Sequence, residues 1–282
     1  MHGIILAWYL PGILSGYRQV RIFALSDYGR NPDISQNAMF EARETLRPLL
    51  EVSRSGSSWR EDPELYPPGG EGLQGSVNLS PAWFQQAHDV SISTYTIYFR
   101  QLIQHQKISQ ECPQPSANFR SPAALKWLDS IPESNAVLSA ILAVIHPQLY
   151  EAGRQTIERL RSTPEIEDPE DLLSRWASVF SGVSVISNRY TPPHRDQGSR
   201  YHWYDILATS GCYRNCDLKL PGLGITLEYG PGTVVGLAGK VLEHEVSSFK
   251  GDRVCYAYFM RNNVHDWANV PASEWMYAKE YE

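Results

Sequence analysis

The feature that most constrains the fold of this chain is the stretch from Tyr190 to Met260, in which short apolar runs are separated by glycine-containing turns. Many short strands punctuated by turns are typical of a β-barrel or sandwich rather than of a helical bundle. The sequence predicts strands over Val183–Tyr190, Trp203–Ser210, Gly224–Tyr229, Thr233–Leu237, Val241–Val246 and Arg253–Met260.

A His-x-Asp pair lies at the start of this stretch. In an extended segment residues two apart point to the same side, so His194 and Asp196 can present an imidazole nitrogen and a carboxylate to one metal ion. His244 is the best third ligand, because it shares one face of its predicted strand with Leu242 and Val246. Two histidines and one carboxylate with open positions are the ligands of non-haem Fe(II) oxygenases.

Arg253 adds a second constraint. It follows a turn and heads a strand that we expect to pair, as an antiparallel neighbour, with the strand that carries His244. A guanidinium in the same cavity as the iron ligands can hold a carboxylate in a bidentate grip, which indicates 2-oxoglutarate as co-substrate. The face expected to point into the cavity comprises Arg253, Cys255, Ala257 and Phe259.

The sequence resembles the Tet/JBP family of Fe(II)/2-oxoglutarate-dependent DNA dioxygenases, and its fungal members in particular. The resemblance lies in residues 187–196, in Trp203-Tyr204-Asp205, in residues 229–235 and in residues 244–261, with weaker likeness in residues 7–11, 79–84 and 138–142. It implies an α+β fold with a double-stranded β-helix (jelly-roll or cupin-like) core flanked by N-terminal helices. It also implies an enzyme that uses Fe(II), 2-oxoglutarate and O₂ to oxidise methyl groups on DNA bases, and hence a nuclear location.

Roles for individual residues follow from the same resemblance. It implies iron at His194, Asp196 and His244 as the catalytic centre, and 2-oxoglutarate bound by Arg253, Asn188 and Arg189. It implies that Phe259 stacks on a flipped base and that Arg261 and Tyr204 contact the substrate. Relatives that act on 5-methylcytosine tend to have a histidine at the position of Arg261, so both 5-methylcytosine and N6-methyladenine stay open as substrates.

The 282 residues predict a single domain, 1–282, with mainly helical support over 1–180 and the catalytic β-core over 181–261. Residues 53–80, rich in serine, glycine and proline, predict a flexible loop. Residues 1–15 read as a buried strand or helix, and residues 86–108 stay open between strand and helix. Helices are expected over residues 33–51, 121–129, 135–145 with a continuation through 155–160, and 168–180.

Charge and cysteine content limit the partners. The net charge of −6 argues against a broadly basic surface, so any DNA contact should lie at the barrel mouth and be sensitive to salt. Four scattered cysteines do not form a disulfide scaffold, and Cys212 and Cys216 read either as free thiols or as half of a zinc site. The apolar start is too short to span a bilayer, so we expect no membrane partner. We also expect a monomer.

Two other functions stay open at this level. The same chemistry could act on a protein, an RNA or a small molecule, because a fold and its iron site do not determine the substrate. A non-catalytic cupin-like binding module is the alternative from another class. Metal content after anaerobic purification separates that module from an enzyme, and oxygen-dependent succinate formation with a panel of substrates separates the enzymes from one another.

Overall fold

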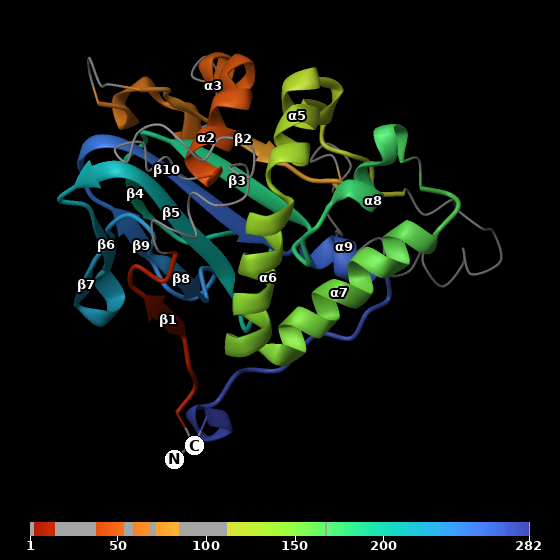
Figure 1. Ribbon diagram of the computed structural model, residues 1–282. Coiled ribbons are helices and arrows are strands. Elements are labelled where there is room, and N and C mark those ends of the chain that lie inside the picture. The colour runs from red at the N-terminus through yellow and green to blue at the C-terminus, as the bar shows by residue number, and fades with distance from the viewer. Residues whose placement is uncertain are drawn as a thin grey trace, which may run out of the picture.

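The computed structural model describes residues 3–14, 38–53, 59–67, 72–84, 112–166 and 168–281. Two antiparallel sheets face each other, as expected for a double-stranded β-helix (Figure 1). The large sheet contains, in spatial order, β1 (Ala7–Leu10), β8 (Val234–Leu237), β5 (Asp205–Arg214), β10 (Lys250–Phe259), β3 (Gly182–Ser187) and β2 (Gly75–Leu79). The small sheet contains β4 (Thr191–His194), β9 (His244–Val246), β6 (Asp217–Leu220) and β7 (Ile225–Glu228).

Alternation along β10 explains why the large sheet has two different apolar faces. Val254, Tyr256 and Tyr258 point away from the small sheet into a core shared with the helices, whereas Cys255 and Ala257 point into the space between the sheets. Successive side chains of a strand project to opposite faces, and residues 253–256 are all buried because both faces of the sheet are covered there. The predicted alternation over residues 253–259 is therefore confirmed.

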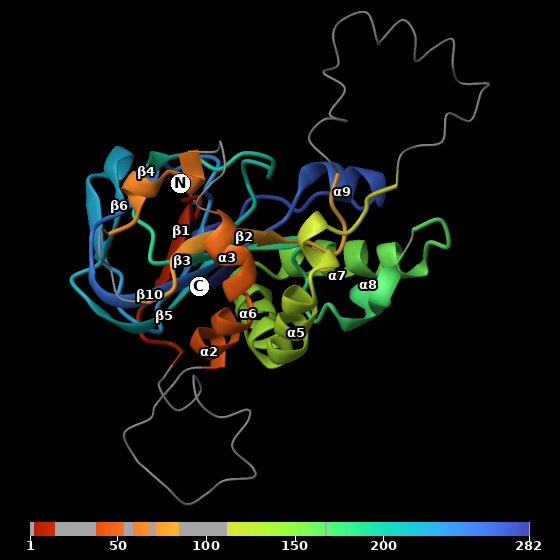
Figure 2. The ribbon, with the colours of Figure 1, turned by 90° about the horizontal axis from the view of Figure 1, so that it is seen from above.

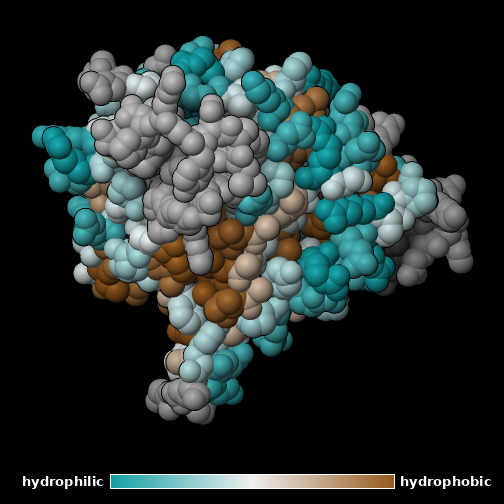
Figure 3. All heavy atoms as spheres, in the orientation of Figure 1, coloured by the Kyte–Doolittle hydropathy of each residue, from teal (hydrophilic) through white to brown (hydrophobic). Residues whose placement is uncertain are grey.

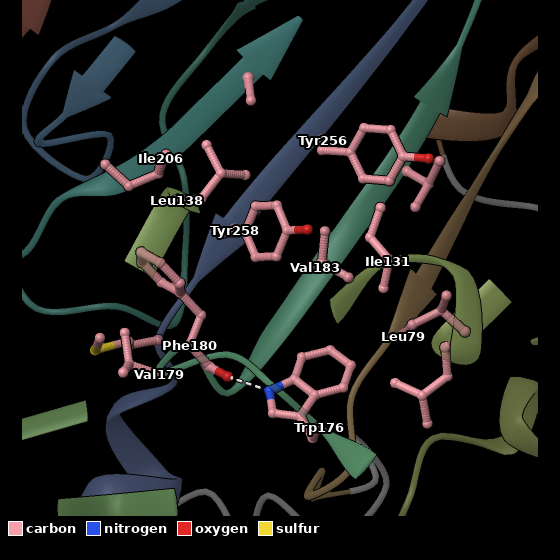
Figure 4. Packing of buried hydrophobic residues seen from close by; sticks show 14 of the residues in the cluster. Leu79, Ile131, Leu138, Trp176, Val179, Phe180, Val183, Ile206, Tyr256 and Tyr258 are labelled. Carbon is pink, nitrogen blue, oxygen red and sulfur yellow. Dashed lines mark hydrogen bonds between the residues drawn. The ribbon is translucent and has the colours of Figure 1, made fainter. Parts of the chain in front are cut away.

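The helices lie together on the outer face of the large sheet (Figures 1 and 2). Figure 4 shows Tyr256 and Tyr258 of β10 in this layer with Ile131, Leu138 and Trp176, all of them buried. The main helices are α2 (Ala38–Thr45), α3 (Arg47–Ser53), α5 (Pro122–Ser130), α6 (Pro132–Ile145), α7 (Pro147–Ser162), α8 (Leu172–Arg175) and α9 (Asn262–Trp267).

Local signals placed several of these helices correctly. Ser121 caps α5 by accepting a hydrogen bond from the Ala123 amide, and Pro122 occupies the first helical turn, where its missing N–H costs nothing. Pro147 separates α6 from α7, because a proline cannot continue the helix before it. The expected helix over residues 33–51 appears as α2 and α3 within the described part, and residues 86–108 lie outside it.

Two predictions outside the β-core were wrong. The helix expected over 168–180 is reduced to α8, because Glu170 and Asp171 adopt positive φ angles before it and Trp176 after it is extended, its indole donating to the Phe180 carbonyl oxygen (2.8 Å, Figure 4). The predicted loop over 53–80 contains β2, which pairs with β3, and two short 3₁₀ helices, Trp59–Glu61 and Pro63–Leu65. Residues 7–10 and 75–79 thus extend the large sheet from outside the predicted β-core.

Apolar side chains also reach the surface. Figure 3 shows hydrophobic residues between β1 and α6 on one face of the molecule, and α6 exposes Val137 and Val144. No single described helix is long and apolar enough to cross a bilayer. The pair α5 and α6 would suffice by length and composition alone, but the two helices meet at an angle of 60°.

One ion pair ties the helical layer to the strand that carries Arg253. The buried guanidinium of Arg43 on α2 donates to both carboxylate oxygens of Asp252, at 2.6 and 3.0 Å. The Asn188 side-chain amide donates to the same carboxylate at 2.6 Å. A bidentate pair with a buried guanidinium has a defined geometry, and removal of its carboxylate leaves the buried charge less well compensated.

We therefore expect Asp252→Asn to lower the free energy of unfolding by about 2–4 kcal/mol, because the buried Arg43 guanidinium then keeps only the solvent-exposed carboxylate of Glu44, 2.8 Å away, as an anionic partner. Urea unfolding followed by circular dichroism measures the change. Glu151→Gln, which breaks a solvent-exposed pair with Arg154 on α7, is the matched control and should leave the unfolding midpoint unchanged. Equal midpoints for Asp252→Asn and the control would show that the pair does not hold the layers together.

Candidate active site

The space between the two sheets holds the candidate metal ligands. His194 and His244 are direct cross-strand partners of β4 and β9, and Asp196 follows β4. One ligand atom from each of the three side chains lies within 4.8 Å of the other two. The Asp196 carboxylate is 3.6 Å from His194 Nε2 and 3.5 Å from His244 Nε2. No other group of at least three His, Cys, Asp or Glu side chains among the described residues meets this criterion.

Backbone carbonyls orient both imidazoles. His194 Nδ1 lies 3.0 Å from the Pro192 carbonyl oxygen, and His244 Nδ1 lies 3.1 Å from that of Leu242. Each Nδ1 can therefore carry the proton and donate it, which leaves the Nε2 lone pair free to face a metal. The residues present fit an ion of the two-histidine, one-carboxylate type.

The electrostatics keep the ligands in the required protonation states. Burial lowers the pKa of His244 and outweighs the opposing effect of Asp196, so the imidazole is held neutral. Burial raises the pKa of Asp196, but the nearby His194, His244 and Arg60 outweigh this effect and hold the pKa below its usual value. A neutral imidazole and an ionised carboxylate are the forms that bind a divalent cation.

Arg253 reaches this space from the opposite sheet. The expected hairpin between its strand and that of His244 was wrong, because β9 pairs with β4 and β6 in the small sheet while β10 pairs with β5 and β3 in the large one. Residues 247–249 cross between the sheets. Both side chains still line the same cavity, since the inner faces of the two sheets are opposed.

The surroundings of Arg253 fit an anion. Its guanidinium is 1% exposed and lies 4.9 Å from the ring centre of Tyr229, yet Nε and Nη2 have no hydrogen-bond partner among the described residues. The buried guanidinium of Arg189 lines the same cavity, and burial lowers its pKa to about 10, so it too is charged at neutral pH. Unsatisfied buried donors are costly unless a ligand satisfies them, and two cationic groups suit a dicarboxylate such as 2-oxoglutarate.

Asn188 does not line this cavity. Its side-chain oxygen accepts from the Arg253 amide at 2.8 Å, and its amide nitrogen donates to Leu73 and Asp252. The predicted direct contact with 2-oxoglutarate is thus replaced by a supporting one, in which Asn188 holds the backbone of Arg253.

Of the three residues predicted to contact the substrate, two line the cavity and one does not. Phe259 and Arg261 line the cavity beside Trp83, and the Arg261 guanidinium lies 4.5 Å from the Trp83 ring centre and 4.8 Å from that of Phe259. Tyr204 instead points into the helical core, where its hydroxyl donates to the Ile5 carbonyl oxygen at 2.6 Å. The prediction for Tyr204 was wrong because it chose the outer face of the strand, and Asp205, one residue on, faces the cavity.

Residues from the predicted loop also approach the metal ligands, and the sequence analysis missed them. The Trp59 ring packs edge-on against His194, with ring centres 5.3 Å apart, and Arg60 lies 4.0 Å from the Asp196 carboxylate. The Tyr190 amide donates to the Leu65 carbonyl oxygen at 2.7 Å and so fastens this segment to the barrel. A tryptophan–arginine pair in a Ser- and Gly-rich stretch carries no periodicity that would have revealed it.

The sequence model of the Tet/JBP family, described as the oxygenase domain of the 2OGFeDO superfamily, matches residues 103–262. This match covers more than half of the chain, and the chain belongs to that family. It is an Fe(II)- and 2-oxoglutarate-dependent dioxygenase.

Comparison with solved structures returns NgTET1 in complex with 5mC DNA, at 17% identity and a TM-score of 0.42, covering 67% of this chain and 73% of that one. It also returns a full-length thymine hydroxylase of Neurospora crassa in complex with alpha-KG, at 13% identity and a TM-score of 0.29, covering 86% and 81%. No curated protein matches the chain by sequence.

We expect His244→Ala to abolish turnover, because it removes one of three metal ligands. Iron content after anaerobic reconstitution should fall, and succinate formation should drop by more than about 100-fold. His202→Gln is the control, since His202 lies outside the triad. Full activity of His244→Ala at saturating iron would refute the ligand assignment. His265, the next histidine along the chain, contacts Thr156 in the core instead.

Arg253→Lys should raise the apparent KM for 2-oxoglutarate by about 10- to 100-fold, since the charge is kept but the forked, bidentate geometry is lost. Iron content should stay at the wild-type level, which separates loss of co-substrate binding from loss of metal. Arg189→Lys, measured in parallel, tests the neighbouring guanidinium. An unchanged KM in Arg253→Lys together with a raised one in Arg189→Lys would transfer the role to Arg189.

Proposed function

We propose that this dioxygenase, like fungal members of its family, oxidises methyl groups on DNA bases, with 5-methylcytosine and N6-methyladenine as the candidates. The observation that carries the proposal is a single cavity of about 1030 Å³ lined by the metal triad, Arg253, Trp83, Phe259 and Arg261. This space exceeds the needs of an ion and a small dicarboxylate. Trp83 and Phe259 give this cavity an aromatic surface and Arg261 gives it a cationic group, which together suit a planar base.

The roles of the protein groups follow from their positions. His194, Asp196 and His244 would hold Fe(II), and Arg253 would bind the far carboxylate of 2-oxoglutarate. With both bound, oxidative decarboxylation of 2-oxoglutarate by O₂ supplies the oxidant that hydroxylates a methyl group. Phe259 offers its ring to a base flipped out of the duplex, because a base inside the stack cannot reach a cavity between two sheets.

Charge at the mouth of the cavity supports a nucleic-acid substrate. The side chain of Arg60 is 41% exposed, and the exposed Arg120 lines the same opening. Cations at this position can contact phosphates next to the flipped nucleotide, even though the chain as a whole has a net charge of −6. Binding of this kind weakens steeply as salt rises.

Phe259→Ala tests the proposal. Stacking on an aromatic side chain is worth about 1–3 kcal/mol per base, so turnover of methylated DNA should fall by about 10- to 100-fold. Decarboxylation of 2-oxoglutarate without DNA should change much less, because Phe259 does not belong to the metal triad or to the arginine pair. Succinate formation with and without methylated oligonucleotides measures both.

Phe259→Leu is the matched variant, since it keeps apolar bulk but removes the aromatic face. It should behave like the alanine variant if stacking matters and like wild type if Phe259 only fills space. Equal loss of coupled and uncoupled activity would assign Phe259 to the barrel core. Absence of turnover on either methylated base would remove DNA bases as the substrate.

A further inference from the structure

Cys255 is a thiol on the inner wall of the cavity, and it belongs neither to the metal triad nor to the arginine pair. It follows Arg253 by two positions on β10, so both side chains project to the same face, and both line the cavity. The residue is 5% exposed, so only a molecule that enters the cavity reaches its sulfur. Of the other cysteines, Cys212 is exposed, and Cys112 and Cys216 do not line this cavity.

The thiol lies on the path from Arg253 to the metal centre. Strand β10 runs antiparallel to β5, so its C-terminal end lies beside Asp205, the first residue of β5. A Cβ atom added at Gly239 would lie 2.7 Å from Asp196 Oδ2 and 2.9 Å from Asp205 Oδ2, so that end of β10 is also next to a metal ligand. The Cα atom of Cys255 is about 7 Å from that of Arg253 in this direction.

Tyr229 connects the thiol with the guanidinium. Its ring centre is 4.9 Å from Arg253 Cζ, and its hydroxyl oxygen is 3.6 Å from Cys255 Sγ. Burial raises the pKa of Tyr229 well above its usual value, so the hydroxyl keeps its proton at neutral pH and can donate to the sulfur. The thiol therefore shares one side of the cavity with Arg253 Nε and Nη2, the two buried donors that have no hydrogen-bond partner among the described residues.

This arrangement combines a site for a dicarboxylate with a nucleophile. A dicarboxylate that is held by Arg253 and extends toward the metal passes the sulfur of Cys255 with its carbon chain. In 2-oxoglutarate the carbons at this place are methylene groups, which do not react with a thiol. An unsaturated four-carbon dicarboxylate has an electron-poor C=C bond there, and a thiolate adds to such a bond. A ligand held against the sulfur reacts faster than the same molecule in solution, because it is already positioned.

We propose that Cys255 is a modification site for unsaturated dicarboxylates, which bind at Arg253 in place of 2-oxoglutarate and alkylate the thiol. The sulfur forms a bond to one alkene carbon, the π electron pair moves to the other, and that carbon takes up the proton that the thiol gives up. No group leaves, and no oxidant or reductant is consumed. The thioether keeps both carboxylates beside Arg253, so 2-oxoglutarate no longer binds and the dioxygenase is inactivated. The inference does not depend on which substrate the enzyme oxidises.

The test treats the Fe(II)-loaded chain with fumarate in the absence of O₂ and follows the protein by mass spectrometry. The wild type should gain the mass of one fumaric acid molecule on the peptide that contains Cys255. Saturating 2-oxoglutarate should slow this gain by about 10- to 100-fold, because the two dicarboxylates compete for Arg253. Loss of oxygen-dependent succinate formation, measured after unbound fumarate is removed, should follow the gain in mass.

Three variants separate binding from reactivity. Arg253→Lys should slow the reaction with fumarate by about tenfold, since it loses the bidentate grip, while uncharged N-ethylmaleimide should label Cys255 equally in both proteins. Cys212→Ser is the matched control, because it removes an exposed cysteine, and fumarate should inactivate it as fast as the wild type. Cys255→Ser should gain no adduct at this peptide and should keep the activity that it had before treatment.

Labelling of Cys255 by N-ethylmaleimide without any fumarate adduct would overturn the proposal, and so would a thiol that neither reagent reaches. An adduct at Cys216 or Cys212 instead would overturn the assignment to Cys255. An adduct at Cys255 that 2-oxoglutarate does not slow would show that the thiol reacts outside the co-substrate site. These outcomes are read from the wild type alone, so they stand even if a variant fails to fold, and they are independent of any activity on DNA.

Discussion

The site depends first on the antiparallel pairing of β4 with β9. That register places His194 directly opposite His244, with ring centres 4.2 Å apart. The carbonyl oxygens of Pro192 on β4 and of Leu242, just before β9, meet the Nδ1 atoms of the two rings, so both Nε2 atoms face the Asp196 carboxylate. Backbone carbonyls therefore orient both imidazoles toward the metal position.

The second half of the site comes from the large sheet and is supported from behind. Arg253 projects inward from β10, while its neighbour Asp252 accepts from Arg43 on α2 and from Asn188. Asn188 has a positive φ angle, which its short polar side chain tolerates, and that side chain accepts from the Arg253 amide. A buried guanidinium held in this way is in place before the co-substrate arrives, so less ordering is needed on binding.

The two walls of the cavity carry different kinds of side chain. The wall that carries the metal triad is formed by two imidazoles and one carboxylate, whereas the wall formed by β5 and β10 carries Arg253, Asp205 and Phe259. The three candidate metal ligands and the buried Arg253 thus lie on opposite sheets. A barrel permits this arrangement because its two inner faces are independent surfaces that meet in one space.

Local sequence patterns determined which residues of each strand share a face, and so placed Arg253, Phe259 and the His-x-Asp pair correctly relative to their own strands. They also located the Ser121 cap and the break at Pro147, because these signals act within a few residues. Only the tertiary structure decided that β9 and β10 belong to different sheets, that Trp59 packs against His194 while Trp83 lines the cavity, and that Asp205 rather than Tyr204 faces inward. A period of two shows that neighbours point apart, but which face is inner depends on hydrogen bonds between strands far apart in the chain.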